Sequence, residues 1–112
     1  MTAEQVNAEI KLAATRLDDA NDALILNIDV DKRKAEIIDE VAYERDGVIK
    51  LWGHLHWTIK GHTLYLKADS VAGGGLYKRT IAISQRSLYD DLWIVLSELL
   101  SSIQQDYIDE GP

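Results

Sequence analysis

The chain has 112 residues, of which 46% are hydrophobic and 28% are charged, and its formal net charge is -7. This length fits one domain, residues 1–112, and the composition excludes a long disordered segment. The absence of cysteine excludes disulfide bonds, thiolate nucleophiles and zinc–thiolate sites. No signal peptide is visible and no apolar stretch approaches the roughly 20 residues of a membrane span, so we expect a cytoplasmic protein that does not enter a membrane.

The charges are segregated along the chain. Residues 1–46 carry 12 acids and 6 bases, residues 47–89 carry 1 acid and 6 bases, and residues 90–112 carry 6 acids and no base. The acidic average therefore conceals a basic middle segment. Overall acidity disfavours nonspecific binding to nucleic acid or to an anionic membrane, whereas the segregation predicts a local basic surface.

The N-terminal segment predicts an amphipathic helix. Its apolar residues recur at alternating spacings of three and four: Ala3, Val6, Ile10, Ala13, Leu17, Ala20 and Leu24. Thr2 and Gln5 have the spacing of a capping box. We expect this helix to reach about Leu26 and to pack on the domain's own core, with pairing to a partner helix as the alternative. Residues 24–30 also alternate as a strand does, so the structure of residues 24–34 stays open.

Residues 37–44 are predicted to form the first strand of a hairpin. The tripeptide Arg45-Asp46-Gly47 precedes an alternating segment, and Asp-Gly in that position is a strong hairpin signal. A three-residue loop with Gly47 in the left-handed conformation would pair Tyr43 with Ile49. This register separates polar from apolar side chains better than a two-residue turn does.

Residues 49–67 alternate between two faces, as expected of two strands joined at Lys60-Gly61. A two-residue turn there would pair Trp57 with Leu64, and it gives both hairpins the same apolar face. The predicted inner face contains Ile49, Leu51, Leu55, Trp57, Leu64 and Leu66. The predicted outer face contains Lys50, Trp52, His54, His56, Thr58, Lys60, Thr63, Tyr65 and Lys67.

A loop, a further strand and a second long helix complete the predicted elements. Residues 69–75 are rich in glycine and predict a flexible loop, and residues 77–84 predict a strand with Ile81 inward and Lys78 outward. The last helix would be capped by Ser84 or Ser87 and presents a wide apolar stripe. The predicted fold is α+β in the order α-β-β-β-β-α, a four-stranded antiparallel meander with the N- and C-terminal helices packed on one face.

The outer face of this sheet is the predicted functional surface. It combines aromatic and cationic side chains: Lys50, Trp52, His54, His56, Tyr65, Lys67 and Lys78. Tryptophan and tyrosine anchor protein interfaces, and stacking rings interleaved with cations bind single-stranded nucleic acid. The acidic terminal segments disfavour a polyanion that wraps the molecule. We therefore favour a protein partner over nucleic acid, with a homodimer as a further alternative.

The sequence gives little support for catalysis. His54-x-His56 could chelate a transition metal with Glu40 as the nearest third ligand, or act with an acid from residues 36–40 as an acid–base pair. No covering element is predicted that would exclude water from this face. Gly73-Gly74-Gly75 leads into a strand, which favours a hairpin loop over a phosphate-binding loop. We expect a non-enzymatic interaction protein, of the inhibitor, immunity or adaptor type, that needs no cofactor or metal and docks through the outer sheet face or its acidic helices.

Overall fold

The computed structural model describes residues 1–20, 24–83 and 88–110. The helices and strands follow in the order α1 (Ala3–Ala20), β1 (Leu24–Asp29), β2 (Lys34–Asp39), α2 (Glu40–Asp46), β3 (Leu51–Lys60), β4 (Thr63–Ser70), β5 (Leu76–Ala82) and α3 (Tyr89–Glu110). Among these helices none is both long and apolar enough to cross a membrane.

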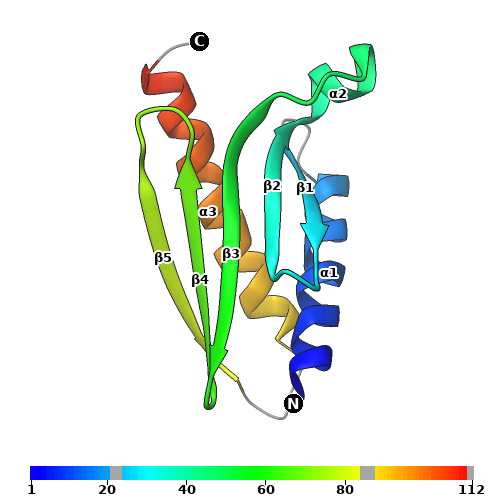
Figure 1. Ribbon diagram of the computed structural model, residues 1–112, viewed down its shortest axis with the longest axis vertical. Helices are drawn as coiled ribbons and strands as arrows, with labels where there is room; N and C mark the ends of the chain where they lie inside the picture. The colour runs from blue at the N-terminus through cyan, green and yellow to red at the C-terminus, as the bar shows by residue number, and fades with distance from the viewer. Residues whose placement is uncertain (21–23, 84–87, 111–112) are drawn as a thin grey trace.

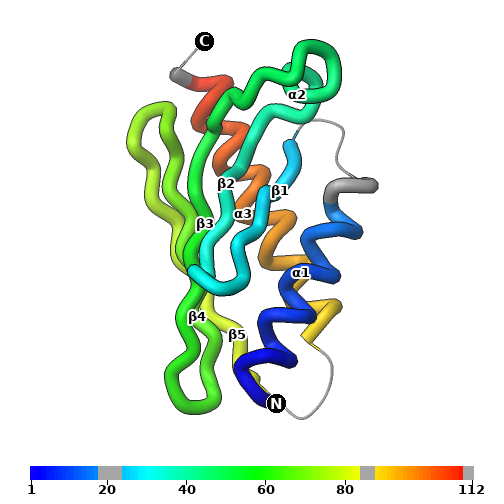
Figure 2. The backbone as a smooth tube through the Cα atoms, turned by 45° about the vertical axis from the view of Figure 1, so that its right-hand side comes forward, coloured from blue at the N-terminus to red at the C-terminus, as the bar shows by residue number. Residues whose placement is uncertain are grey.

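The strands form one antiparallel sheet in the order β1-β2-β3-β4-β5, so that each strand pairs with its neighbour in the sequence. The two long helices, α1 and α3, lie on the same side of this sheet (Figure 1; Figure 2). The α+β class and the terminal helices are as predicted. The sheet, however, has five strands rather than four. The additional strand is β1, which comes from the segment that the sequence leaves open.

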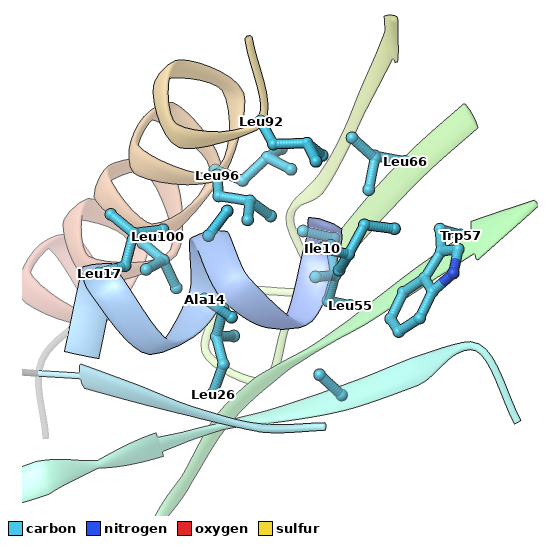
Figure 3. Close-up of a cluster of buried hydrophobic side chains, with 14 of the residues drawn as sticks. Ile10, Ala14, Leu17, Leu26, Leu55, Trp57, Leu66, Leu92, Leu96 and Leu100 are labelled. Atoms are coloured by element: carbon cyan, nitrogen blue, oxygen red, sulfur yellow. The ribbon is translucent and has the colours of Figure 1, made fainter. Parts of the chain in front are cut away.

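The hydrophobic core lies between the two long helices and the sheet (Figure 3). Ile10 of α1, Leu96 of α3 and Leu55 of β3 are all buried. Trp57 of β3 also faces this layer, and its indole N–H donates to the side-chain oxygen of Asn7 at 2.9 Å. Each fully buried leucine or isoleucine contributes roughly 1.5–3 kcal/mol, so this layer holds the helices on the sheet.

The start of α1 agrees with the prediction and its end does not. The backbone N–H of Thr2 donates to the side chain of Gln5 at 2.7 Å, and the N–H of Gln5 donates to the hydroxyl of Thr2 at 3.2 Å, which completes a capping box. The helix ends at Ala20 rather than near Leu26. Leu24 and Leu26 are instead buried in β1, because their alternation fits the pairing of β1 with β2.

The predicted hairpin around Asp46-Gly47 is wrong. Residues Glu40–Asp46 form the short helix α2. Asp39 caps its N-terminus, because its carboxylate accepts the backbone N–H of Ala42 at 2.9 Å. Gly47 has the predicted left-handed conformation, with φ 65°, but it ends a helix, where such glycines are common. Tyr43 and Ile49, predicted as an inward pair, are 46% and 59% exposed.

The hairpin of β3 and β4 has the predicted faces but a different register. The turn consists of Gly61 and His62, so Trp57 pairs with Leu66 rather than with Leu64. Because the register is displaced by two residues, the side chains of residues 54–60 and 63–67 keep their predicted faces. The glycine-rich residues 71–75 connect β4 to β5 as a hairpin loop, as predicted. The proposed caps of the last helix, Ser84 and Ser87, lie outside the described residues.

A β-bulge interrupts β3 at Trp52. Ile37 of β2 pairs with Gly53, and the next residue, Ile38, pairs with Leu51, so Trp52 is an extra residue without a partner in β2. The extra residue reverses the alternation of the strand. Trp52 and Gly53 consequently point to the same side, toward the helices.

The prediction that Trp52 lies on the outer face is wrong, because the bulge turns this side chain toward the helices. Its side chain is 8% exposed and its indole stacks on the ring of Tyr107 in α3. Gly53 permits this arrangement, because a β-carbon at that position would lie 2.3 Å from the carbonyl oxygen of Asp69 in β4. Only a residue without a side chain lets β3 and β4 approach so closely.

Candidate functional site

Outward-pointing side chains form rows across the strands on the outer face of the sheet, which is the face opposite α1 and α3. One row, which we name the basic row, crosses β2, β3, β4 and β5 and consists of Lys34, His56, Lys67 and Lys78. The neighbouring row, which we name the acidic row, consists of Glu36, His54 and Asp69. The register of the sheet therefore assembles both rows from residues far apart in the sequence.

One end of the basic row, at the edge strand β5, is a pair of like charges. Lys67 of β4 lies directly opposite Lys78 of β5, and both side chains are exposed. Neither lysine forms an ion pair with a carboxylate of the described residues. Like charges directly opposite each other destabilise an antiparallel pair, by about 0.2–1 kcal/mol. The pair therefore destabilises the pairing of β4 with β5, and neither lysine has an ion-pair partner among the described residues that would reduce this repulsion.

A hollow of about 450 Å³ lies over the same strands. Its lining includes Tyr65, Thr80, Lys67 and Lys78. Tyr65 is 43% exposed, and the ammonium group of Lys60 lies 5.7 Å from the centre of its ring. We name this feature the basic hollow. It offers cations, an aromatic ring and hydroxyl groups within one depression.

The acidic row contains a carboxylate shared by two imidazoles. Asp69 lies with one carboxylate oxygen 2.9 Å from Nδ1 of His54 and with the other 3.8 Å from Nε2 of His56. In the same row Glu36 accepts a hydrogen bond from the side chain of Asn27 at 3.3 Å. The side chains of His54, His56 and Asp69 are each about 40% exposed, at 40%, 44% and 39%. Asp69 thus contacts both histidines and forms no ion pair with Lys67 or Lys78.

Asp69 and Lys34 are site residues that the sequence interpretation missed. Asp69 was expected in the glycine-rich loop, yet alternation from Leu64 onward already gives it an outward position in β4. Lys34 belongs to β2, and its place opposite His56 depends on a strand whose start the sequence leaves open. A second hollow, of about 670 Å³, opens beside the acidic row along the β1–β2 hairpin.

Two of the predicted surface residues lie elsewhere. Trp52 is stacked on Tyr107, and the ammonium group of Lys50 lies 4.7 Å from the centre of the same tyrosine ring. A side-chain hydrogen bond with Tyr107 raises the pKa of Lys50 above its ordinary value. Both residues therefore interact with α3 and do not belong to the outer-face rows. The predicted outward positions of His54, His56, Tyr65, Lys67 and Lys78 agree with the structure.

His54, His56 and Asp69 are the nearest approach to a metal-ligand set, and Glu40, the third ligand considered from the sequence, lies in α2. Within residues 1–20, 24–83 and 88–110, no three His, Asp or Glu side chains are arranged so that they could hold a metal ion. The chemistry that the outer face does offer is that of ionic contacts, hydrogen bonds and stacking.

The chain matches no family model, no curated protein and no solved structure.

Proposed function

We propose that the protein is a non-enzymatic interaction protein that docks on a protein partner through the outer face of its sheet. The observation that carries the proposal is the opposition of Lys67 and Lys78, two exposed cations that form no ion pair with a carboxylate of the described residues. Local rules of sheet stability are broken most often where function requires it. A partner that brings negative charge to this pair would remove the repulsion.

The exposed aromatic side chain of this face supports a docking role. Tyr65 lies in the basic hollow beside the lysine pair. Tyrosine is enriched at the energetic centres of protein interfaces, because one large ring combines apolar area with a hydroxyl group. The combination of one central ring and a surrounding set of charges is typical of a standard interface rather than of a catalytic cleft.

The His54–Asp69 pair does not alter this proposal. A general acid–base pair requires a positioned substrate and exclusion of water to be effective. Both side chains are about 40% exposed, at 40% and 39%, on a face that neither α1 nor α3 covers. The pair therefore lacks the exclusion of water that catalytic proton transfer requires.

Single-stranded nucleic acid is the second candidate ligand, and the basic hollow is the observation in its favour. Single-strand binders usually stack successive bases on several aromatic rings. With Trp52 buried against α3, the rings on the outer face of the described strands are the phenol of Tyr65 and the partly exposed imidazoles of His54 and His56, both of which lie beside Asp69. The burial of Trp52 and the carboxylate beside the imidazoles rank nucleic acid below a protein partner.

Photo-crosslinking in the native host tests the proposal. Replacing Tyr65 with p-benzoylphenylalanine places the reactive group in the basic hollow, and replacing Leu12, which is 48% exposed on α1, provides a control on the helical layer. We expect a discrete protein adduct from position 65 that disappears when Lys67→Glu and Lys78→Glu are added. An adduct from position 12 alone would overturn the proposal in favour of the acidic helices. A nuclease-sensitive adduct would favour nucleic acid, and one of twice the chain's mass would favour a homodimer.

A further inference from the structure

The charges around the basic hollow limit the size of the ligand that it can receive. Residues i and i+2 of a strand are roughly 7 Å apart, so the acidic row begins about that far from the lysine pair. An anion that lies against Lys67 and Lys78 is thus attracted over a short distance only. An anion that extended from Lys67 along β4 toward Asp69 would meet the carboxylates of Asp69 and Glu36.

The opposite border of the basic row carries hydroxyl groups, and the ammonium group of Lys60 lies 5.7 Å from the centre of the Tyr65 ring there. There Thr58 of β3 and Thr80 of β5 lie on either side of Tyr65, each directly opposite it. Hydroxyl groups both donate and accept hydrogen bonds, so they suit a peptide backbone, which presents both kinds of group. A peptide bound here would have carboxylates at the lysines and backbone groups within reach of these hydroxyl groups.

The lysine pair itself fits two carboxylates that belong to one extended chain. Directly opposed residues of an antiparallel pair have Cα atoms about 4.5–5.5 Å apart, and repulsion drives the two flexible ammonium groups further apart than that. Alternate side chains of an extended peptide project to one side with a spacing of roughly 6.6–6.8 Å. Two acidic residues at positions i and i+2 would therefore each reach one lysine.

We infer that the basic hollow receives a short, extended, acidic segment of the partner protein, with carboxylates at alternate positions against Lys67 and Lys78. This inference rests on the proposed docking function and specifies the chemistry of the docked segment. Nucleic acid is disfavoured because the acidic row borders the lysines and places a carboxylate, Asp69, beside the imidazoles of His54 and His56.

Fluorescence anisotropy with defined probes tests the inference. The probes are a fluorescein-labelled peptide of alternating serine and glutamate, the same peptide with glutamine in place of glutamate, and an oligothymidine of equal length. We expect the wild-type chain to bind the glutamate peptide, and the affinity to fall with added salt. Lys67→Gln with Lys78→Gln should lower that affinity at least about tenfold, as expected for the loss of two contacts between charged groups.

A matched control separates the site from net charge. Lys11→Gln with Lys32→Gln removes the same charge from two exposed lysines outside the hollow and should leave the affinity within about twofold, since surface charges act mainly over a Debye length. Circular dichroism confirms that each variant is folded. Equal losses in both double variants, equal binding of the glutamine peptide, or tighter binding of oligothymidine would each overturn the inference.

The crosslinking experiment and the anisotropy experiment test the docking function and the acidic segment separately. A charge-dependent crosslink from position 65 without binding of the glutamate peptide would retain the docking function and reject the acidic segment. Peptide binding without any protein crosslink would reject docking on a protein in the host and leave a site for acidic groups. Neither result leaves the inference undecided.

Discussion

The indole of Trp52 stacks on the phenol ring of Tyr107, with the ring centres 4.1 Å apart and the ring planes 12° from parallel. The contact joins the bulge in β3 to the C-terminal half of α3. Stacked aromatic pairs contribute about 0.5–1.5 kcal/mol beyond the area that they bury. This pair therefore holds the end of α3 on the sheet and takes the largest aromatic side chain away from the outer face.

We expect Trp52→Ala to lower the free energy of unfolding by about 3–5 kcal/mol, the usual effect of removing a buried aromatic side chain. Trp52→Phe is the matched variant. The indole nitrogen of Trp52 has no hydrogen-bond partner among the described residues, so phenylalanine loses ring contact but no hydrogen bond, and its effect should be smaller. Urea unfolding followed by circular dichroism measures both. An unchanged unfolding free energy for Trp52→Ala would show that the side chain is exposed after all.

Alternation predicts the faces of β3 correctly on one side of the bulge and wrongly on the other. Leu55 and Trp57 are buried and His54 and His56 lie outside, as the period of two requires. The extra residue, Trp52, then reverses the faces of the strand. The hydrophobic pattern does not reveal this reversal, because tryptophan is found both in cores and on surfaces. Gly53 was the available signal, because an isolated glycine in a strand marks a bulge or a close backbone approach.

Gly53→Ala should destabilise the pairing of β3 with β4, because the new methyl group would lie 2.3 Å from the carbonyl oxygen of Asp69. We expect a loss of about 1–3 kcal/mol, as for other overpacked sites. Hydrogen exchange of the Val71 amide, which donates to the carbonyl of Trp52 at 3.0 Å, should accelerate. Gly61→Ala is the comparison: nothing lies within 4 Å of its new methyl group, but Gly61 has φ 59°, so alanine strains the turn between β3 and β4. It should therefore affect amides near that turn more than the Val71 amide.

The error at Asp46-Gly47 has a different cause. A left-handed glycine after an aspartate ends both hairpin loops and helices, so the local sequence is compatible with either structure. The partner of β3 decides between them, and that partner is β2, at residues 34–38. The opposition of Lys67 and Lys78 is likewise a matter of register. Each lysine is predictably outward, but the length of the glycine-rich loop does not determine which residue of β5 lies opposite Lys67.

A hydrogen bond between β5 and α3 should make stability depend on pH at the alkaline end. The hydroxyl of Tyr77 donates to Asp106 at 2.6 Å, and this bond raises the pKa of Tyr77 above its ordinary value of 10.0. A raised pKa means that the folded state favours the protonated phenol. The stabilisation is therefore complete below pH 10 and is lost as the pH rises through the folded-state pKa.

Comparison of Tyr77→Phe with the wild type tests this dependence. The difference in unfolding free energy should be constant from neutral pH to about pH 9 and should shrink above the ordinary tyrosine pKa. Tyr43→Phe, at an exposed position of α2, is the control and should leave stability unchanged. A difference between wild type and Tyr77→Phe that grows with alkaline pH would contradict the assigned hydrogen bond.

Lys67→Thr should raise stability and weaken partner binding at the same time. The substitution removes the repulsion with Lys78, so we expect a gain of about 0.2–1 kcal/mol in the unfolding free energy, diminishing with salt. Threonine also favours strands, so part of any gain could come from this preference. Lys34→Thr is the control for it, because Lys34 lies opposite Asp29 of β1 and its removal relieves no repulsion between those two strands. Urea unfolding at low and high salt compares the two. If Lys34→Thr stabilises the chain as much as Lys67→Thr does, strand preference explains the gain and the lysine pair is not a cost maintained for binding.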